Sequence, residues 1–236
     1  MSDWPIRIEN VDGLDCRIES FDWRFARDCA AEIAAHWCGL AAGRPSMFDG
    51  RVFMMHRGEV VDGRLASAHF ETSFSAFISW RDFGFKDRTV RNCFAMAALR
   101  GNDGAFVLAE MGAHTANGGK IYFPAGTPDL EDARGEVLDL DGSVLRELEE
   151  ETGLAPHEVR LGKGWTLVDA GPRLGCMKIV EIDAPALEIK RDLDARIAAQ
   201  SEAELAAMRV VRSARDFDAV RMPDFIVAYL AHMLRT

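Results

Sequence analysis

Three glutamates near the middle of the chain have the spacing of a shared helix face. Glu147, Glu150 and Glu151 stand at positions i, i+3 and i+4, so on an α-helix their carboxylates lie on the same side. Like charges at this spacing repel and destabilise a helix by roughly a few tenths of a kcal/mol. A divalent cation would offset the repulsion, because Mg²⁺ and Mn²⁺ prefer oxygen ligands and commonly bridge carboxylates to substrate phosphates. The three glutamates are therefore candidate metal ligands.

The residues around these glutamates match the end of a known family motif. Residues 146–154 read Arg-Glu-Leu-Glu-Glu-Glu-Thr-Gly-Leu, which resembles the second half of the Nudix box, Arg-Glu-hydrophobic-any-Glu-Glu-any-Gly-hydrophobic. A chance match to all of its fixed positions in this chain has a probability on the order of 10⁻⁵. The alternative is a glutamate-rich, solvated helix face without a ligand. The order of Arg146 and Glu147 and the stop at Gly153 favour the Nudix resemblance.

The first half of the box departs from the family pattern. At the family spacing, the expected Gly falls on Asp132 and the expected Glu on Leu138. Residues 122–126, Tyr-Phe-Pro-Ala-Gly, resemble the strand and Pro-Gly-Gly segment that begin a Nudix loop, with Ala125 in place of one Gly. We interpret the difference as a six-residue insertion within residues 127–140. Two acids are candidate replacements for the missing Glu: Asp139 and Glu136.

The resemblance implies a role for each residue of the motif. Glu147, Glu150 and Glu151 would hold roughly one to three Mg²⁺ ions, with Mn²⁺ as a substitute, and the carbonyl oxygen of Gly126 would be a further ligand. The ions would clamp the oxygens of a diphosphate and activate the attacking water. Arg146 would pair with a carboxylate and orient it. The implied activity is hydrolysis of a diphosphate linkage in a nucleoside diphosphate derivative.

Other side chains are weaker candidates for the same site. Glu202 and Glu204 are candidates for a further acid from a later loop, although glutamates on a surface helix are the ordinary alternative. Histidines and arginines are candidates to contact phosphate, and aromatic rings to stack a base, although structural or surface roles are commoner for all three kinds. The histidines are His56, His69 and His114, the arginines are Arg51, Arg81 and Arg88, and the aromatic residues are Phe48, Phe53, Phe74 and Trp80.

Composition restricts the partners and the compartment. The 236 residues are 48% hydrophobic and 28% charged, which is typical of a globular protein. The net charge of −10 disfavours general affinity for nucleic acid or an anionic membrane, so we expect a small-molecule nucleotide as the partner, and the oligomeric state is not predicted. The first residues lack a basic, apolar signal, and no run of about 18 apolar residues occurs, which predicts a cytoplasmic protein. The five cysteines are expected to be free thiols.

The elements that would position the glutamates follow the hydrophobic pattern of the chain. We expect an α/β protein with a mixed sheet between helices, the α/β/α sandwich of the Nudix fold. Residues 1–90 are expected to be an α+β extension that contributes to the substrate pocket, and residues 91–236 to be the Nudix domain. Strands are expected at 51–55, 60–61, 65–70, 93–99, 105–110, 120–123, 165–169 and 177–182, with a turn at Gly58. Helices are expected at 22–40 with Asp22 as N-cap, 74–80, 142–152 with Asp141 as N-cap, 202–208 and 224–234.

Scattered segments resemble one branch of the family. Residues 47–53, 72–74 and 80–83 are similar to the N-terminal region of UDP-sugar diphosphatases, which also have a long loop before the catalytic helix. The resemblance implies a UDP-sugar substrate. The alternatives are ADP-ribose, NADH, a dinucleoside polyphosphate or coenzyme A as substrate, or a non-catalytic Nudix module that binds a nucleotide or a protein partner. The intact set of Glu147, Glu150 and Glu151 disfavours a module that only binds.

Overall fold

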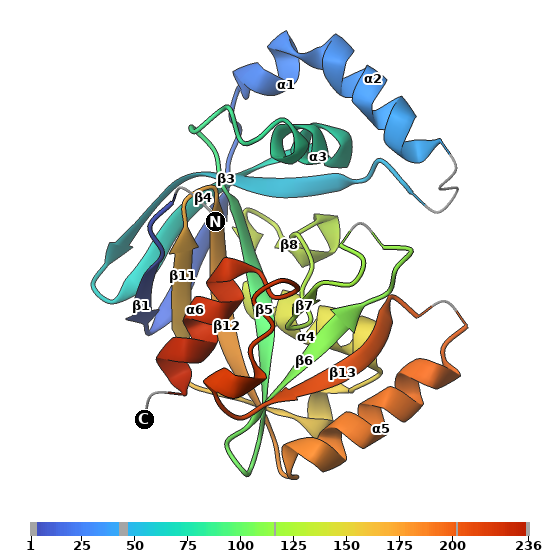
Figure 1. Cartoon of the computed structure of the whole chain (residues 1–236). Coiled ribbons are helices and arrows are strands. Elements are labelled where there is room, and N and C mark those ends of the chain that lie inside the picture. The colour runs from blue at the N-terminus through green and yellow to red at the C-terminus, as the bar shows by residue number, and fades with distance from the viewer. Residues whose placement is uncertain (1–3, 43–46, 116, 202, 235–236) are drawn as a thin grey trace.

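The chain forms two β-sheets with helices packed against them (Figure 1). This computed structural model describes residues 4–42, 47–115, 117–201 and 203–234. The first sheet has the strand order β1-β11-β12-β5-β6-β13, with β10 paired to β12 and β7 paired to β6. Its strands are β1 (Arg7–Val11), β5 (Asn92–Gly101), β6 (Phe106–Met111), β7 (Ile121–Tyr122), β10 (Arg160–Leu161), β11 (Trp165–Ala170), β12 (Arg173–Ile182) and β13 (Leu205–Val211).

The first sheet is mixed and is covered by helices. β5 and β12 run parallel, with Asn92 opposite Arg173 at one end, and the neighbouring pairs are antiparallel. β5 is buried along almost its whole length, as expected for a strand covered on both faces. Helix α4 (Leu140–Thr152) packs against β5, α6 (Asp224–Met233) packs against β11 on the opposite face, and α5 (Ala186–Ala199) packs along β13 (Figure 1). The expected mixed sheet between helices is confirmed.

The second sheet contains most of the first part of the chain. Its strand order is β3-β4-β2-β9-β8. The strands are β2 (Gly13–Ile18), β3 (Arg51–Val61), β4 (Arg64–Ser73), β8 (Ala133–Arg134) and β9 (Val137–Leu138). Helix α3 (Phe74–Asp82) packs on β3 and β4, and the helices α1 (Arg24–Asp28) and α2 (Ala30–Ala41) lie beyond it (Figure 1). Because β8 and β9 come from the expected insertion, that segment is paired with the N-terminal part of the chain.

One part of the second sheet shares a hydrophobic core with the first sheet, and another part packs with α3 in a separate cluster. Phe53, Met55 and Leu65 of the second sheet belong to the same buried cluster as the central strands of the first sheet. Strand β1 pairs along its whole length with β11, so residues 1–90 also supply an edge strand of the first sheet. All five cysteines are free thiols. No helix within the described ranges is long and apolar enough to cross a membrane.

Several elements differ from the expectation. The helix expected at 22–40 is divided at Cys29, whose φ of −106° and ψ of 22° interrupt the helix, and its N-cap position is Trp23 and not Asp22. Gly58 is not a turn; it lies inside β3, next to a register shift that follows Met55. The segment expected as a helix at 202–208 forms β13, which pairs with β6, and Glu202 itself lies outside the described residues. Helix α5 was not expected.

Candidate active site

Helix α4 is fixed at both ends and to the sheet. Its N-cap is Asp139, whose carboxylate accepts a hydrogen bond from the N–H of Gly142 at 2.9 Å, so the expected cap at Asp141 is wrong. Asp141 lies one position inside the helix and pairs instead with the buried amino group of Lys178 on β12, at 3.0 Å. Gly153 ends the helix with a φ of 74°, a left-handed conformation that favours glycine. These contacts set the position of the glutamates relative to the sheet.

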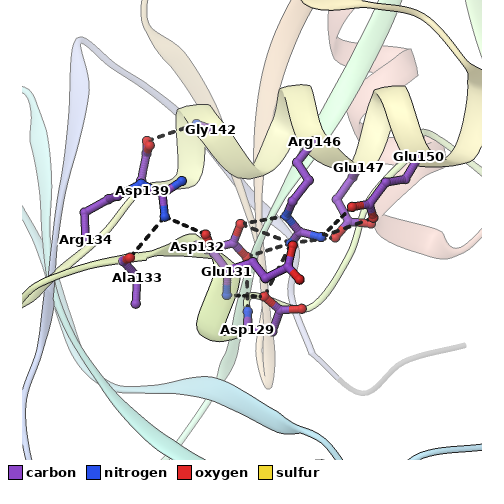
Figure 2. A network of polar contacts seen from close by, with 10 residues as sticks. All are labelled: Asp129, Glu131, Asp132, Ala133, Arg134, Asp139, Gly142, Arg146, Glu147 and Glu150. Atoms are coloured by element: carbon purple, nitrogen blue, oxygen red, sulfur yellow. Dashed lines mark hydrogen bonds and ion pairs between the residues drawn. The ribbon is translucent and has the colours of Figure 1, made fainter.

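Arg146, on this helix, lies among carboxylates from the helix itself and from the inserted segment (Figure 2). Its guanidinium donates to both oxygens of Asp132, each at 3.1 Å. It also lies 2.9 Å from Glu147 Oε1 and 3.2 Å from Glu150 Oε2, with Asp129 slightly farther away at 3.6 Å. Arg146 therefore holds two of the three candidate ligands, as a positioning residue would.

The inserted segment brings the main partner of Arg146 to the helix. Asp132 is 2% exposed, and it closes a short 3₁₀ turn, Leu130–Asp132, by accepting from the N–H of Asp129 at 3.1 Å. Neither acid considered from the sequence has this position, because Asp139 caps α4 and Glu136 is exposed. The family spacing places a glycine at 132, so nothing in the motif indicated this contact. The interaction depends on the path of the inserted loop.

Glu147 lies directly against Gly126. A Cβ at position 126 would stand 2.1 Å from Glu147 Oε1, so the carboxylate has room only because residue 126 is a glycine. The side chain of Glu147 is 13% exposed, and burial raises its pKa to about 7, although the nearby charge of Arg146 acts in the opposite sense. A cation next to this carboxylate would favour its ionised form.

Glu151 is the most buried of the three glutamates. It is 6% exposed, and its carboxylate accepts a hydrogen bond from the backbone of Ala125. Its Oε2 is buried without a hydrogen-bond partner among the residues that the structure describes. Burial raises the pKa of Glu151 well above its ordinary value, and the negative charges of Glu147 and Glu204 act in the same sense. An unpartnered buried oxygen beside a second carboxylate is a ligand atom that a divalent cation could coordinate.

The three glutamates do not surround a single point in the structure. Within the described part of the chain, no group of three His, Cys, Asp or Glu side chains lies close enough together to hold a metal ion. Glu147 and Glu151 offer carboxylate oxygen atoms of the kind that Mg²⁺ prefers, one of them buried and unpartnered, and these two residues fit the ion. The side chain of Glu150 is 55% exposed and pairs with Arg146, so it would have to leave that contact to join them. The complete ligand set, with Gly126, stays a prediction.

A cavity of about 390 Å³ borders Gly126. Three cations line it, Arg81, Lys120 and Arg173, and none of the described residues in its wall is acidic. The aromatic residues of the wall are Phe74, Phe77, Phe94, Tyr122 and Phe225. Arg81 and Arg173 also pair with the neighbouring acids Asp82 and Asp224, so the wall presents partly neutralised cations beside aromatic surface. This combination suits an anionic ligand that carries a planar ring.

Some of the weaker candidates lie at this cavity or near the glutamates. Arg81 and Phe74, both on α3, are part of the cavity wall. Glu204 lies close enough to Glu151 for its charge to affect the pKa of that residue. The ring of His114 and the backbone carbonyl of Glu204 both lie close to Gly112. These four residues remain candidates for contact with substrate.

The other candidates have structural contacts of their own or are exposed. His69 is fully buried and hydrogen-bonds to Ser67 at 3.0 Å, while Arg51 pairs with Glu71 at 2.6 Å on the surface. Phe53 and Trp80 are buried, and His56 stacks on the ring of Phe21. Arg88 lies over the ring of Trp4, and Phe48 is exposed. None of these residues is part of the cavity wall.

Comparison with known proteins gives weak matches. No family model matches the chain, and no curated protein matches it. Among solved structures, it is similar to a Nudix hydrolase from M. smegmatis, RenU, with 14% identity and a TM-score of 0.39 over 61% of this chain and 81% of that chain. It is also similar to a MutT protein from Methanosarcina mazei Go1, with 18% identity and a TM-score of 0.39 over 61% and 94%.

A third similar structure is a pyrophosphohydrolase from Bacillus subtilis, BsRppH. The identity is 15%, and the TM-score is 0.31 over 54% of this chain and 65% of that chain. All three TM-scores are below 0.5, so an assignment of function depends on the residues of the site itself.

Proposed function

We propose that the protein is a divalent-metal-dependent Nudix hydrolase that cleaves a diphosphate linkage in a nucleoside diphosphate derivative. The observation that carries this proposal is the pair of half-buried Glu147 and buried Glu151, whose carboxylates have raised pKa values and one orphaned oxygen, next to a cationic, aromatic cavity. When bound, Mg²⁺ or Mn²⁺ would neutralise charge on the diphosphate and assist attack by water.

Each residue of the site would have a defined task in this reaction. Glu147 and Glu151 would hold the metal, and Arg146 would position Glu147 and Glu150. Lys120 in the cavity wall would offset the remaining charge of the substrate phosphates. One water is consumed: its oxygen bonds to phosphorus, the bridging P–O bond breaks with its electron pair going to the leaving phosphate, and the protons of the water pass to the product phosphates and the solvent.

For the substrate we propose a UDP-sugar such as UDP-glucose, cleaved to UMP and a sugar 1-phosphate. Support comes from the similarity of residues 47–53, 72–74 and 80–83 to UDP-sugar diphosphatases. It also comes from the part of the cavity wall that α3 supplies, because a substrate with two bulky ends needs walls beyond the metal helix. On this proposal, residues 1–90 are part of the substrate pocket.

Parallel turnover assays test both levels of the proposal. UDP-glucose, ADP-ribose, NADH, a dinucleoside polyphosphate and coenzyme A are incubated with the protein in Mg²⁺ or in EDTA, and products are separated by chromatography. We expect turnover only with Mg²⁺ and the highest kcat/KM for UDP-glucose. A preference for another substrate would refute the UDP-sugar assignment alone. Saturable nucleotide binding without any turnover would instead favour a binding module. The pairing of Glu150 with Arg146, and not with a metal, is consistent with that function.

A further inference from the structure

Two polar side chains lie side by side in the wall of the cavity with unmet hydrogen-bonding capacity. Asn92 and Arg173 are direct partners at the start of the parallel β5–β12 pair, and both line the cavity. Asn92 Oδ1 and Arg173 Nε are buried and have no hydrogen-bond partner among the described residues. A folded protein rarely leaves a buried acceptor and a buried donor unpaired next to each other, so a ligand is a natural partner for both.

Arg173 is held in place by contacts that leave Nε unused. Its guanidinium donates to Asp224 at 3.3 Å and lies over the ring of Phe225, 5.2 Å from the ring centre. Phe225 packs edge-on against Phe94 at 5.9 Å, and both rings line the same cavity. The donor is therefore fixed beside an aromatic surface on which a planar ring can stack.

The available groups match one class of base. The amide of Asn92 supplies one acceptor, Oδ1, and a donor, Nδ2, and Arg173 Nε supplies a second donor. Uracil offers one N–H donor between two carbonyl acceptors, and cytosine offers one amino donor and two acceptors, so each needs one acceptor and two donors from the protein. Guanine offers two donors and one acceptor on the corresponding edge, and adenine offers one of each. The set on this protein is thus complementary to pyrimidines.

We propose that Asn92 and Arg173 are specificity-determining residues that bind the pyrimidine ring of a nucleotide. The inference rests on the proposed function, because the phosphate end of the same nucleotide would extend along the cavity to Gly126 and the glutamates beyond it. Lys120 and Arg81 lie in the same wall and would compensate the charge of the phosphates. The cavity volume of about 390 Å³ is within the range usual for small-molecule sites.

Binding of nucleoside monophosphates without metal tests this proposal separately from catalysis. Isothermal titration of the full chain in EDTA with UMP, CMP, AMP, GMP and ribose 5-phosphate gives five dissociation constants. We expect UMP and CMP to bind about tenfold more tightly than AMP and GMP, because a purine leaves a buried group of the site unpaired. Asn92→Leu should weaken UMP about tenfold and leave ribose 5-phosphate unchanged. Asn102→Leu, the same change in a turn outside this cavity, should leave all five constants unchanged.

Other results would overturn the proposal. It fails if purines bind as tightly as pyrimidines, if no monophosphate binds, or if Asn92→Leu binds UMP like the wild type. Should Asn92→Leu fold poorly, Asn92→Asp keeps the size and the acceptor but removes the donor, and wild-type affinity of that variant for UMP would also refute the assignment. Selective UMP binding without Mg²⁺-dependent turnover of UDP-glucose would refute the hydrolase and keep the pyrimidine site. Mg²⁺-dependent turnover together with tighter binding of purine monophosphates would refute the pyrimidine site and keep the hydrolase.

Discussion

The contact between Asp132 and Arg146 makes a quantitative prediction for the variant Asp132→Asn. The carboxylate is 2% exposed, so solvent does not screen the pair as it does on the surface. Loss of a hydrogen bond between charged groups costs about 1.5–3 kcal/mol. Arg146 keeps Glu147 and Glu150 as partners, and burial raises the pKa of Asp132, which shows that its charge is itself costly to bury. We therefore expect a loss near the lower end, about 2 kcal/mol.

Thermal unfolding measures this loss directly. In a chain of this size, about 2 kcal/mol corresponds to a decrease in Tm of about 4–8 °C. The matched control is Glu131→Gln, the same kind of change at the adjacent, exposed position, for which we expect a stability change within about 0.5 kcal/mol. If Asp132→Asn melts within 1 °C of the wild type, roughly a quarter of the smallest expected shift, Asp132 is not the residue that fixes Arg146.

Three further predictions concern the core, the site and the N-terminal region. Burial lowers the pKa of His69 from 6.5 to about 4, so the unfolded chain binds this proton more tightly, and the free energy of unfolding relative to His69→Gln should fall by about 3 kcal/mol as pH decreases from about 6.5 to about 4. Urea unfolding that gives the same difference between wild type and His69→Gln at both pH values would contradict this. Gly126→Ala should displace Glu147 and reduce kcat about a hundredfold, whereas Gly39→Ala, which meets no neighbouring atom, should not change it. Deletion of residues 1–90 removes β1 from its pairing with β11 and should give insoluble protein in expression trials; a soluble, active truncation would refute this.

The sequence predicted the parts of the fold that depend on local pattern. Strands β5, β6 and β11 and helices α3 and α6 lie close to their expected positions, because each has a clear run of apolar residues between turn residues, whereas β12 begins at Arg173 and not at the expected Met177. Helix α5 was missed although Ile189, Leu193 and Ile197 recur every four residues after Pro185, which is a recognisable helical stripe. β13 was misassigned because its alanines favour a helix, and pairing with β6 outweighs that preference.

The candidate site was predictable only in its helix. The motif placed the glutamates and Arg146 on α4 correctly, because their spacing is local to one element. It could not indicate Asp132, whose contact with Arg146 depends on the path of the inserted loop. Nor could the spacing indicate that Glu151 is buried against Ala125. Burial and long-range contacts of this kind are properties of the folded chain and not of residue spacing.

Turnover of UDP-glucose by matched glutamate variants is the most direct test of the central claim. Glu151→Gln removes a buried carboxylate with an orphaned oxygen, and Glu149→Gln makes the same change at an exposed position of the same helix. With Mg²⁺, we expect the wild type and Glu149→Gln to release UMP at similar rates. Glu151→Gln should lose at least about a hundredfold in kcat while its Tm is unchanged or higher, since it no longer buries a charge. Wild-type turnover by Glu151→Gln, or equal turnover of the wild type in EDTA, would contradict the assignment of a metal-dependent site to this helix.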